Sequence, residues 1–414
     1  MPAFATTLAA LLLSAANVTW ASANSVATGD QDDPAVAMNR FGRSAVVWED
    51  DRDATDPGDD NHSDIYLRTF QDGVPVFERK LSAGGAGGTD WTHLNPDVAL
   101  DDDGNAVVVW AEDADGNAYF NISYRVVSPA GTVLASGQAN ANAAGDQIVP
   151  RVAVDPDGTP ADSSATAFTV VWEDVQGTVF TVRAAGFTAK TTKAYEVAAS
   201  QTTGNHHHPD VAVSASGDAT VVWEQDADGN GDADVGLVRL AKANGAVLLS
   251  RRTANLGLAG QQRRPAVAAN FAGDFVVAWQ AGTSGVWARS FAATAAPLHT
   301  ELAVTTATNA TTPAVGLDDQ ANALVGWTVG GADGWVRGLN PTGTTTGRLP
   351  VQTLTQLTTG RQDQLVVAVS PWSEVTACYT DDNDGNGFDQ VMLGVGTTNS
   401  DQNLRVRPQD RRLP

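Results

Sequence analysis

The segment from Asp226 to Asp234 carries oxygen-bearing side chains at alternate positions. Asp226, Asp228 and Asn230 stand at positions 1, 3 and 5 of the segment, Gly231 at position 6 and Asp234 at position 9. Alternate side chains can converge on one point, the glycine permits a sharp turn, and the last carboxylate closes the cage around a hard cation. This spacing predicts a structural calcium site. The alternative is a solvated acidic turn without a metal.

Two other segments repeat this loop with less regular spacing. Their candidate ligands are Asp382, Asp384, Asn386 and Asp389 in one segment, and Asp113, Asp115 and Asn117 in the other. A longer acidic run over residues 50–64 has no clear register. We therefore expect one to three bound calcium ions.

The histidines offer a second kind of chemistry. Three of the six stand together as His206, His207 and His208. Alternate residues of an extended strand point the same way, so His206 and His208 could share a transition metal or a ligand with a donor from an adjacent loop, either His93 or Asp146. Trp91 is a candidate for ligand contact because no other repeat has a tryptophan at that position. The alternative is an exposed polar loop.

Paired carboxylates for acid–base catalysis are available in quantity. Four of them follow the same strand in successive repeats, namely Glu49, Glu112, Glu173 and Glu224. Because they recur with the repeat, we interpret them as groups that solvate loops or bind metal. The chain contains no phosphate-binding glycine loop, GxSxG, HExxH or CxxC motif, so a cofactor enzyme is disfavoured.

These residues are positioned by a sequence repeat that occurs seven times. The first copy reads PAVAMNRFGRSAVVWED, and the copies begin near residues 34, 96, 150, 209, 265, 313 and 365. The spacing of roughly 45 to 62 residues is close to that of propeller blades. Each copy reads as four short strands with period-two alternation and no helical period.

A single four-stranded sheet cannot bury both of its faces. Seven sheets packed radially bury these faces against one another, so the sequence predicts an all-β fold, a seven-bladed β-propeller with four-stranded antiparallel blades. An aromatic residue ends the second strand of every copy, from Trp48 in the first to Tyr379 in the seventh. We interpret it as a wedge between neighbouring blades. In this arrangement the acidic loops and the His206–His208 run share one face of the disc.

The repeat and its loops resemble two known groups of proteins. The PxVA…G…VVxW repeat is similar to that of secreted bacterial seven-bladed propeller proteins, over residues 34–407. The DxDxNG-type loop at Asp226 resembles the calcium loops of integrin α subunits and related FG-GAP repeats. This second resemblance implies that calcium has a structural role in the blade loops rather than a catalytic one.

The N-terminal residues 1–23 contain an apolar run followed by Ala21-Ser22-Ala23, which fits a secretory signal peptide with a cleavage site after Ala23. The remaining residues, 24–414, would then form a single propeller that is secreted, extracellular or periplasmic. The alternative is that the N-terminus forms an outer strand, because residues 17–34 resemble residues 132–150. Ring closure stays open between residues 24–33 and the C-terminal NLRVRP.

The overall charge limits the possible partners. The chain has 48 acidic and 25 basic residues and a formal charge of −23, so nucleic acid and anionic membranes are disfavoured. The single cysteine, Cys378, excludes internal disulfides, and no segment after the N-terminus predicts membrane insertion. We therefore expect an acidic extracellular module that binds glycan or protein, for example in adhesion. The alternative function is a carbohydrate-active lyase or hydrolase with its site near the central channel.

Overall fold

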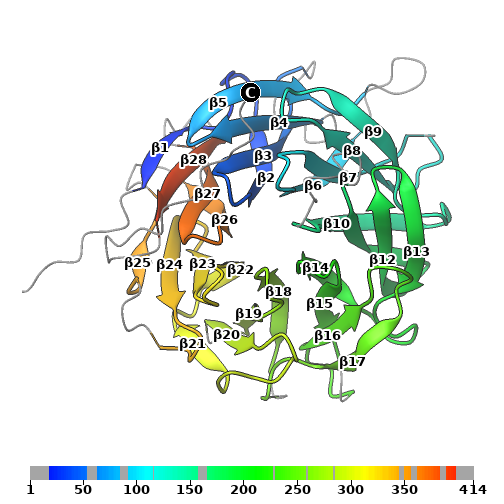
Figure 1. Ribbon diagram of the computed structural model, residues 1–414, viewed down its shortest axis with the longest axis vertical. Helices are drawn as coiled ribbons and strands as arrows, with labels where there is room; N and C mark the ends of the chain where they lie inside the picture. Colours follow the sequence, from blue (N-terminus) through cyan, green and yellow to red (C-terminus); the bar gives the residue numbers. More distant parts are fainter. Residues whose placement is uncertain are drawn as a thin grey trace, which may run out of the picture.

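The computed structural model is a ring of seven four-stranded antiparallel sheets arranged around a central channel (Figure 1). It describes residues 18–53, 63–83, 92–114, 116–156, 166–226, 229–257, 260–282, 285–344, 349–355, 361–382 and 388–397. Every regular element in these residues is a strand. No helix in them is long and apolar enough to cross a membrane. The predicted seven-bladed propeller is thus confirmed.

The first four blades follow the chain in order, each from its inner to its outer strand. Blade 1 contains β2 (Gln31–Met38), β3 (Arg43–Asp50), β4 (Asp64–Gln71) and β5 (Val74–Lys80). Blade 2 contains β6 (His93–Leu100), β7 (Ala106–Glu112), β8 (Asn121–Val127) and β9 (Val133–Gln138). Blade 3 contains β10 (Asp146–Val154), β11 (Phe168–Gln176), β12 (Val179–Ala189) and β13 (Thr192–Ala198). Blade 4 contains β14 (His207–Val213), β15 (Ala219–Gln225), β16 (Asp234–Leu240) and β17 (Val247–Thr253).

The last three blades include the one that combines both ends of the propeller. Blade 5 contains β18 (Gln262–Ala269), β19 (Phe275–Ala281), β20 (Val286–Phe291) and β21 (Leu302–Thr305). Blade 6 contains β22 (Ala310–Leu317), β23 (Ala323–Val329), β24 (Asp333–Leu339) and β25 (Gln352–Thr353). Blade 7 contains β26 (Gln362–Val369), β27 (Glu374–Asp381) and β28 (Gln390–Thr397), with β1 (Thr19–Ser22) as its outer strand.

The N-terminal strand β1 closes the ring. It pairs antiparallel with β28, with Trp20 opposite Gly394, and Figure 1 shows the two strands side by side. A side chain at Gly394 would collide with Trp20, because an added Cβ would lie 2.6 Å from its ring. The closing strand precedes the residues 24–33 that we had considered, and it lies inside the predicted signal peptide. The NLRVRP segment lies outside the described residues.

The recurring aromatic residues are wedges between blades, as predicted. All seven are at most 1 % exposed: Trp48, Trp110, Trp172, Trp223, Trp279, Trp327 and Tyr379. Each packs into a cluster that joins two neighbouring blades. Trp110 of blade 2, for example, packs with Val47 and Leu67 of blade 1. Because burial of the sheet faces depends on these contacts, the ring is the unit of stability.

Candidate ligand site at the channel mouth

The inner strand of every blade contains a β-bulge near its N-terminal end. The pairing register skips residues there, for example between Ile148 and Arg151 in blade 3. The residue before the repeat proline, or before Leu365 in blade 7, has a positive φ of 44° to 54° in all seven blades. We call these residues the bulge ring: Asp33, Asn95, Val149, His208, Arg264, Thr312 and Gln364. The left-handed backbone is costly for β-branched Val149 and Thr312, so tertiary contacts must hold it.

Buried glutamates of the neighbouring blade hold three of these bulges. The Oε1 atom of Glu49 accepts a hydrogen bond from the backbone N–H of Asn95 at 2.6 Å. Glu173 accepts one from His208 at 2.7 Å, and Glu224 accepts one from Arg264. These glutamates therefore join adjacent blades. This corrects our interpretation of them as groups that solvate loops or bind metal.

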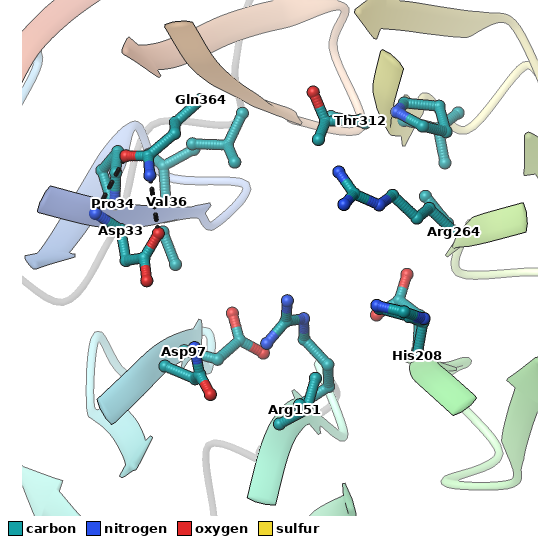
Figure 2. Close-up of a pocket in the computed structure, with 18 of the residues that line it drawn as sticks. Asp33, Pro34, Val36, Asp97, Arg151, His208, Arg264, Thr312 and Gln364 are labelled. Carbon is teal, nitrogen blue, oxygen red and sulfur yellow. Dashed lines mark hydrogen bonds between the residues drawn. The ribbon is translucent and has the colours of Figure 1, made fainter. Parts of the chain in front are cut away.

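The bulge ring surrounds a cavity of about 430 Å³ at one mouth of the channel (Figure 2). A second tier of side chains lies one step deeper, at the residue that follows each proline position. This tier consists of Ala35, Asp97, Arg151, Asp210, Ala266, Ala314 and Val366. Its charged residues stand on three adjacent blades, whereas the other four positions are small or apolar. The sevenfold symmetry of the wedges is thus lost at the channel mouth.

The charged residues of the second tier are Asp97, Arg151 and Asp210, which follow one another around the channel on blades 2, 3 and 4. Asp97 and Asp210 each accept a hydrogen bond at 2.7 Å from the next blade, from the N–H of Val152 and of Val267 respectively. Burial raises the pKa of Asp210 to about 7, although the backbone N–H of Val267 and the charge of Arg151 oppose the shift. Burial also raises the pKa of Asp97. Both carboxyl groups therefore support the ring as well as lining the cavity.

On blades 7 and 1 the bulge ring satisfies its own polar groups. Gln364 donates to the Oδ1 atom of Asp33 at 2.7 Å and accepts from the Asp33 N–H at 2.9 Å, as Figure 2 shows. Burial raises the pKa of Asp33, and burial together with the Asp33 charge raises the pKa of Glu49 well above its usual value. The carboxyl groups of Asp33 and Glu49 are therefore neighbours whose charges repel each other.

The candidate histidines lie in different places. His208 lines the cavity, and its Nδ1 atom lies 2.9 Å from Oε1 of Glu224. His206 is buried edge-on against Trp223, with Nε2 donating to the carbonyl of Thr203 at 3.1 Å. The two side chains therefore do not follow the alternation that we expected, because the bulge interrupts the strand between them.

A further candidate, His93, is not among the residues that line the cavity. His93 is buried, and its Nδ1 atom donates to the carbonyl of Ser63 at 2.8 Å. Its Nε2 atom lies 3.3 Å from Oε2 of Glu112, so both ring nitrogens face groups of the blade packing. Trp91 lies outside the described residues.

In the described part of the Asp226 loop, acidic side chains accept hydrogen bonds from the protein itself. Asp226 accepts hydrogen bonds from the N–H groups of Gly229, Asn230 and Gly231 at 2.8 to 3.1 Å. Asp234 is fully buried and accepts a hydrogen bond from Asn255 at 2.8 Å. In the corresponding loop of blade 2, Asp113 accepts from the N–H groups of Asn117 and Ala118.

The loop of blade 7 contributes to an acidic cluster that we did not predict. One oxygen each of Asp30, Asp32 and Asp389 lies within 4.8 Å of the others. Asp382 donates its N–H to the carbonyl of Arg361. The predicted ligands Asp115, Asp228, Asp384 and Asn386 lie outside the described residues. Calcium therefore stays a prediction.

Sequence reasoning found only His208 of the bulge ring. The sequence contains a signal for these residues, because the residue before the proline varies in type while the proline itself recurs in six of the seven copies. The standard expectation for a residue before proline is an extended backbone, so alternation places this side chain incorrectly. Arg264 and Asp33 were missed for this reason, and Arg151, which follows the proline, was also missed.

Comparisons with known proteins identify the fold. No protein-family model matches the chain, and no curated protein sequence matches it. The chain is similar to the structure of a protein of unknown function from Dyadobacter fermentans, with 11 % identity, TM-score 0.51, and 92 % of this chain and 99 % of that chain covered. It is also similar to an α-L-arabinofuranosidase from Fusarium graminearum, with 9 % identity, TM-score 0.51, and coverage of 74 % and 93 %. A third similar structure is the polysaccharide lyase Uly1, with 10 % identity, TM-score 0.50, and coverage of 87 % and 88 %. At these identities the likeness shows a shared propeller architecture.

Proposed function

We propose that the protein is a carbohydrate-binding propeller that holds one end or one branch of a glycan in the mouth of its central channel. The main support is the contrast between the seven equivalent wedges and the seven non-equivalent residues of the bulge ring. The ring combines carboxylate, amide, guanidinium, imidazole and hydroxyl groups around one cavity. A ligand rich in hydroxyl groups needs such a mixture of donors and acceptors.

The names of two structures with the same fold make glycans the first ligand class to test, since one is an arabinofuranosidase and the other a polysaccharide lyase. Binding is favoured over cleavage because the carboxyl groups near the cavity already have structural partners. Asp97 and Asp210 accept backbone N–H groups of the next blade, and Glu173 and Glu224 hold bulges.

A hydrolase or lyase is the second candidate. One observation favours it: Asp33 lines the cavity, and burial raises the pKa values of Asp33 and of its neighbour Glu49. A carboxyl group with a raised pKa can act as a proton donor. Measurement of reducing ends and of unsaturated products after incubation with polysaccharides distinguishes cleavage from binding.

The test of binding uses a variant that fills the cavity. Thr312→Trp places a large side chain in the bulge ring, and Val247→Trp places the same side chain on the exposed outer strand β17 as a control. We expect affinity electrophoresis in gels that contain arabinan, pectin or alginate to show retention of the wild type and of Val247→Trp. Thr312→Trp should migrate freely. Equal retention of all three proteins would place the binding surface elsewhere and would contradict the proposal.

A further inference from the structure

The bulge ring has two unlike halves. On blades 7 and 1 its polar groups are satisfied, because Gln364 and Asp33 bind each other. On blades 4, 5 and 6 the ring consists of His208, Arg264 and Thr312. This second half presents donors to the cavity.

Arg264 is the central group of the donor half. Its backbone N–H is fixed by Glu224, and Figure 2 shows its guanidinium group extending into the opening. Within the described residues this guanidinium forms no ion pair. A guanidinium group carries several N–H donors in a fixed planar arrangement.

The neighbours of Arg264 add further donors. The Nδ1 atom of His208 pairs with Glu224, so its Nε2 atom is left for the cavity. The hydroxyl of Thr312 has no partner among the described residues. Arg151 extends into the same opening from the second tier (Figure 2). Its charge acts on Asp97 and Asp210, which stand on the two adjacent blades.

Glu224, the carboxylate that contacts both His208 and the backbone of Arg264, does not cancel this arrangement. Burial opposes its ionisation, but the hydrogen bond and charge of His208 lower its pKa, and it accepts the Arg264 N–H. Its charge is therefore shared between two donors of the protein. The guanidinium of Arg264 stays available to a ligand.

From this asymmetry we propose that the cavity contains an anionic subsite, in which Arg264, His208 and Thr312 bind the carboxylate or sulfate group of an acidic sugar residue. The subsite rests on the proposed carbohydrate function and names its ligand class. A planar guanidinium binds a carboxylate through two parallel hydrogen bonds, and the histidine and the hydroxyl complete the contacts. The amide and carboxyl groups of the opposite half then face the sugar hydroxyls.

The experiment compares three oligosaccharides of equal length by calorimetry: an oligogalacturonate, its methyl ester, and a sulfated oligogalactan. The variants are Arg264→Gln and its neighbour Arg263→Gln. Both remove one positive charge from β18, but Arg263 does not line the cavity and instead contacts Gln261. We expect the wild type and Arg263→Gln to bind an acidic oligomer at least tenfold more tightly than the ester. Arg264→Gln should lose about ten- to a hundredfold in affinity, as expected for a charged hydrogen bond.

The outcomes separate the subsite from the proposed function. Preference for the galacturonate or for the sulfated oligomer supports the subsite and identifies the anionic group. Equal binding of the ester, with no effect of Arg264→Gln, overturns the subsite and leaves carbohydrate binding intact. An equal loss of affinity in Arg263→Gln and Arg264→Gln also overturns the subsite, because the effect would then come from the overall electrostatic field of the protein. Failure of every oligomer to bind overturns both proposals.

Discussion

Glu173 connects blades 3 and 4 through both of its carboxylate oxygens. One accepts the His208 N–H at 2.7 Å, and the other lies 3.2 Å from Nδ1 of His207. The side chain is nearly fully buried, so its removal would leave the His208 N–H without an acceptor. Such a loss costs about 1–3 kcal/mol.

We therefore predict that Glu173→Ala lowers the free energy of unfolding by about 1–3 kcal/mol. Glu173→Gln keeps an amide oxygen for the N–H and should lose less. Urea denaturation at pH 8 measures both variants. If Glu173→Ala is as stable as the wild type, the buried glutamates do not hold the bulges.

The same pair predicts a dependence on pH. The hydrogen bond from His207 to Glu173 raises the pKa of His207, although burial opposes the shift. The resulting stabilisation is complete below the unfolded pKa of about 6.5 and is lost as the pH rises through the folded value. Glu173→Gln should therefore lose more stability at pH 6 than at pH 8. An equal loss at both values would show that the pair is not ionic.

Residue types alone did not reveal where the site residues point. The inner strands alternate as the sequence predicts until the bulge, where a positive φ redirects one side chain into the channel. Local preferences argue against that conformation before a proline, and contacts from the preceding blade, such as that of Glu224 with the Arg264 N–H, hold it in place. His206 and His208 were misplaced relative to each other for this reason.

At the level of elements, β1 is the strand whose role was hardest to predict. Its segment resembles residues 132–150, which include the outer strand β9, but it also resembles the end of a signal peptide. The structure uses it as the fourth strand of blade 7. Cleavage after Ala23 would remove this strand and leave the edge of β28 unpaired, which is a recognised cause of aggregation. The signal peptide itself stays a prediction.

The closing strand can be tested at Trp20. Its ring packs edge-on against Tyr379 with centroids 4.8 Å apart. We predict that Trp20→Ala lowers the free energy of unfolding by about 1–3 kcal/mol, less than a fully buried tryptophan because Trp20 is half-buried. Leu134→Ala in the exposed outer strand β9 is the control. Equal, small losses in chemical denaturation would contradict closure by β1.

The acidic loops lead to a prediction about calcium. Burial and the neighbouring Asp30 raise the pKa of Asp389 to about 6, so its carboxylate charge is costly in the absence of a cation. We predict that calcium raises the melting temperature at pH 7. At a calcium concentration of 100 times Kd, binding stabilises the folded state by about 2.7 kcal/mol. Asp389→Asn should reduce this gain. If neither a chelator nor added calcium changes the melting temperature, the calcium prediction is wrong.

At the scale of the whole molecule, the ring was predictable because its physical cause repeats in the sequence. Seven copies that end in an aromatic wedge require seven sheets that cover one another, and the wedges from Trp48 to Tyr379 are all buried. The channel mouth could not be predicted in this way. Its side chains differ from blade to blade, so their meeting depends on ring closure rather than on any local pattern.

The central claim is that the differences between blades converge on the channel mouth and create a carbohydrate site there. The most direct measurement is a crystal structure of the protein with the glycan that it retains best in affinity electrophoresis. We predict sugar density inside the bulge ring, in contact with Arg264 and with the Asp33–Gln364 side of the cavity. Sugar bound only on the outer strands or on the acidic loops, with the channel mouth filled by water, would contradict the account.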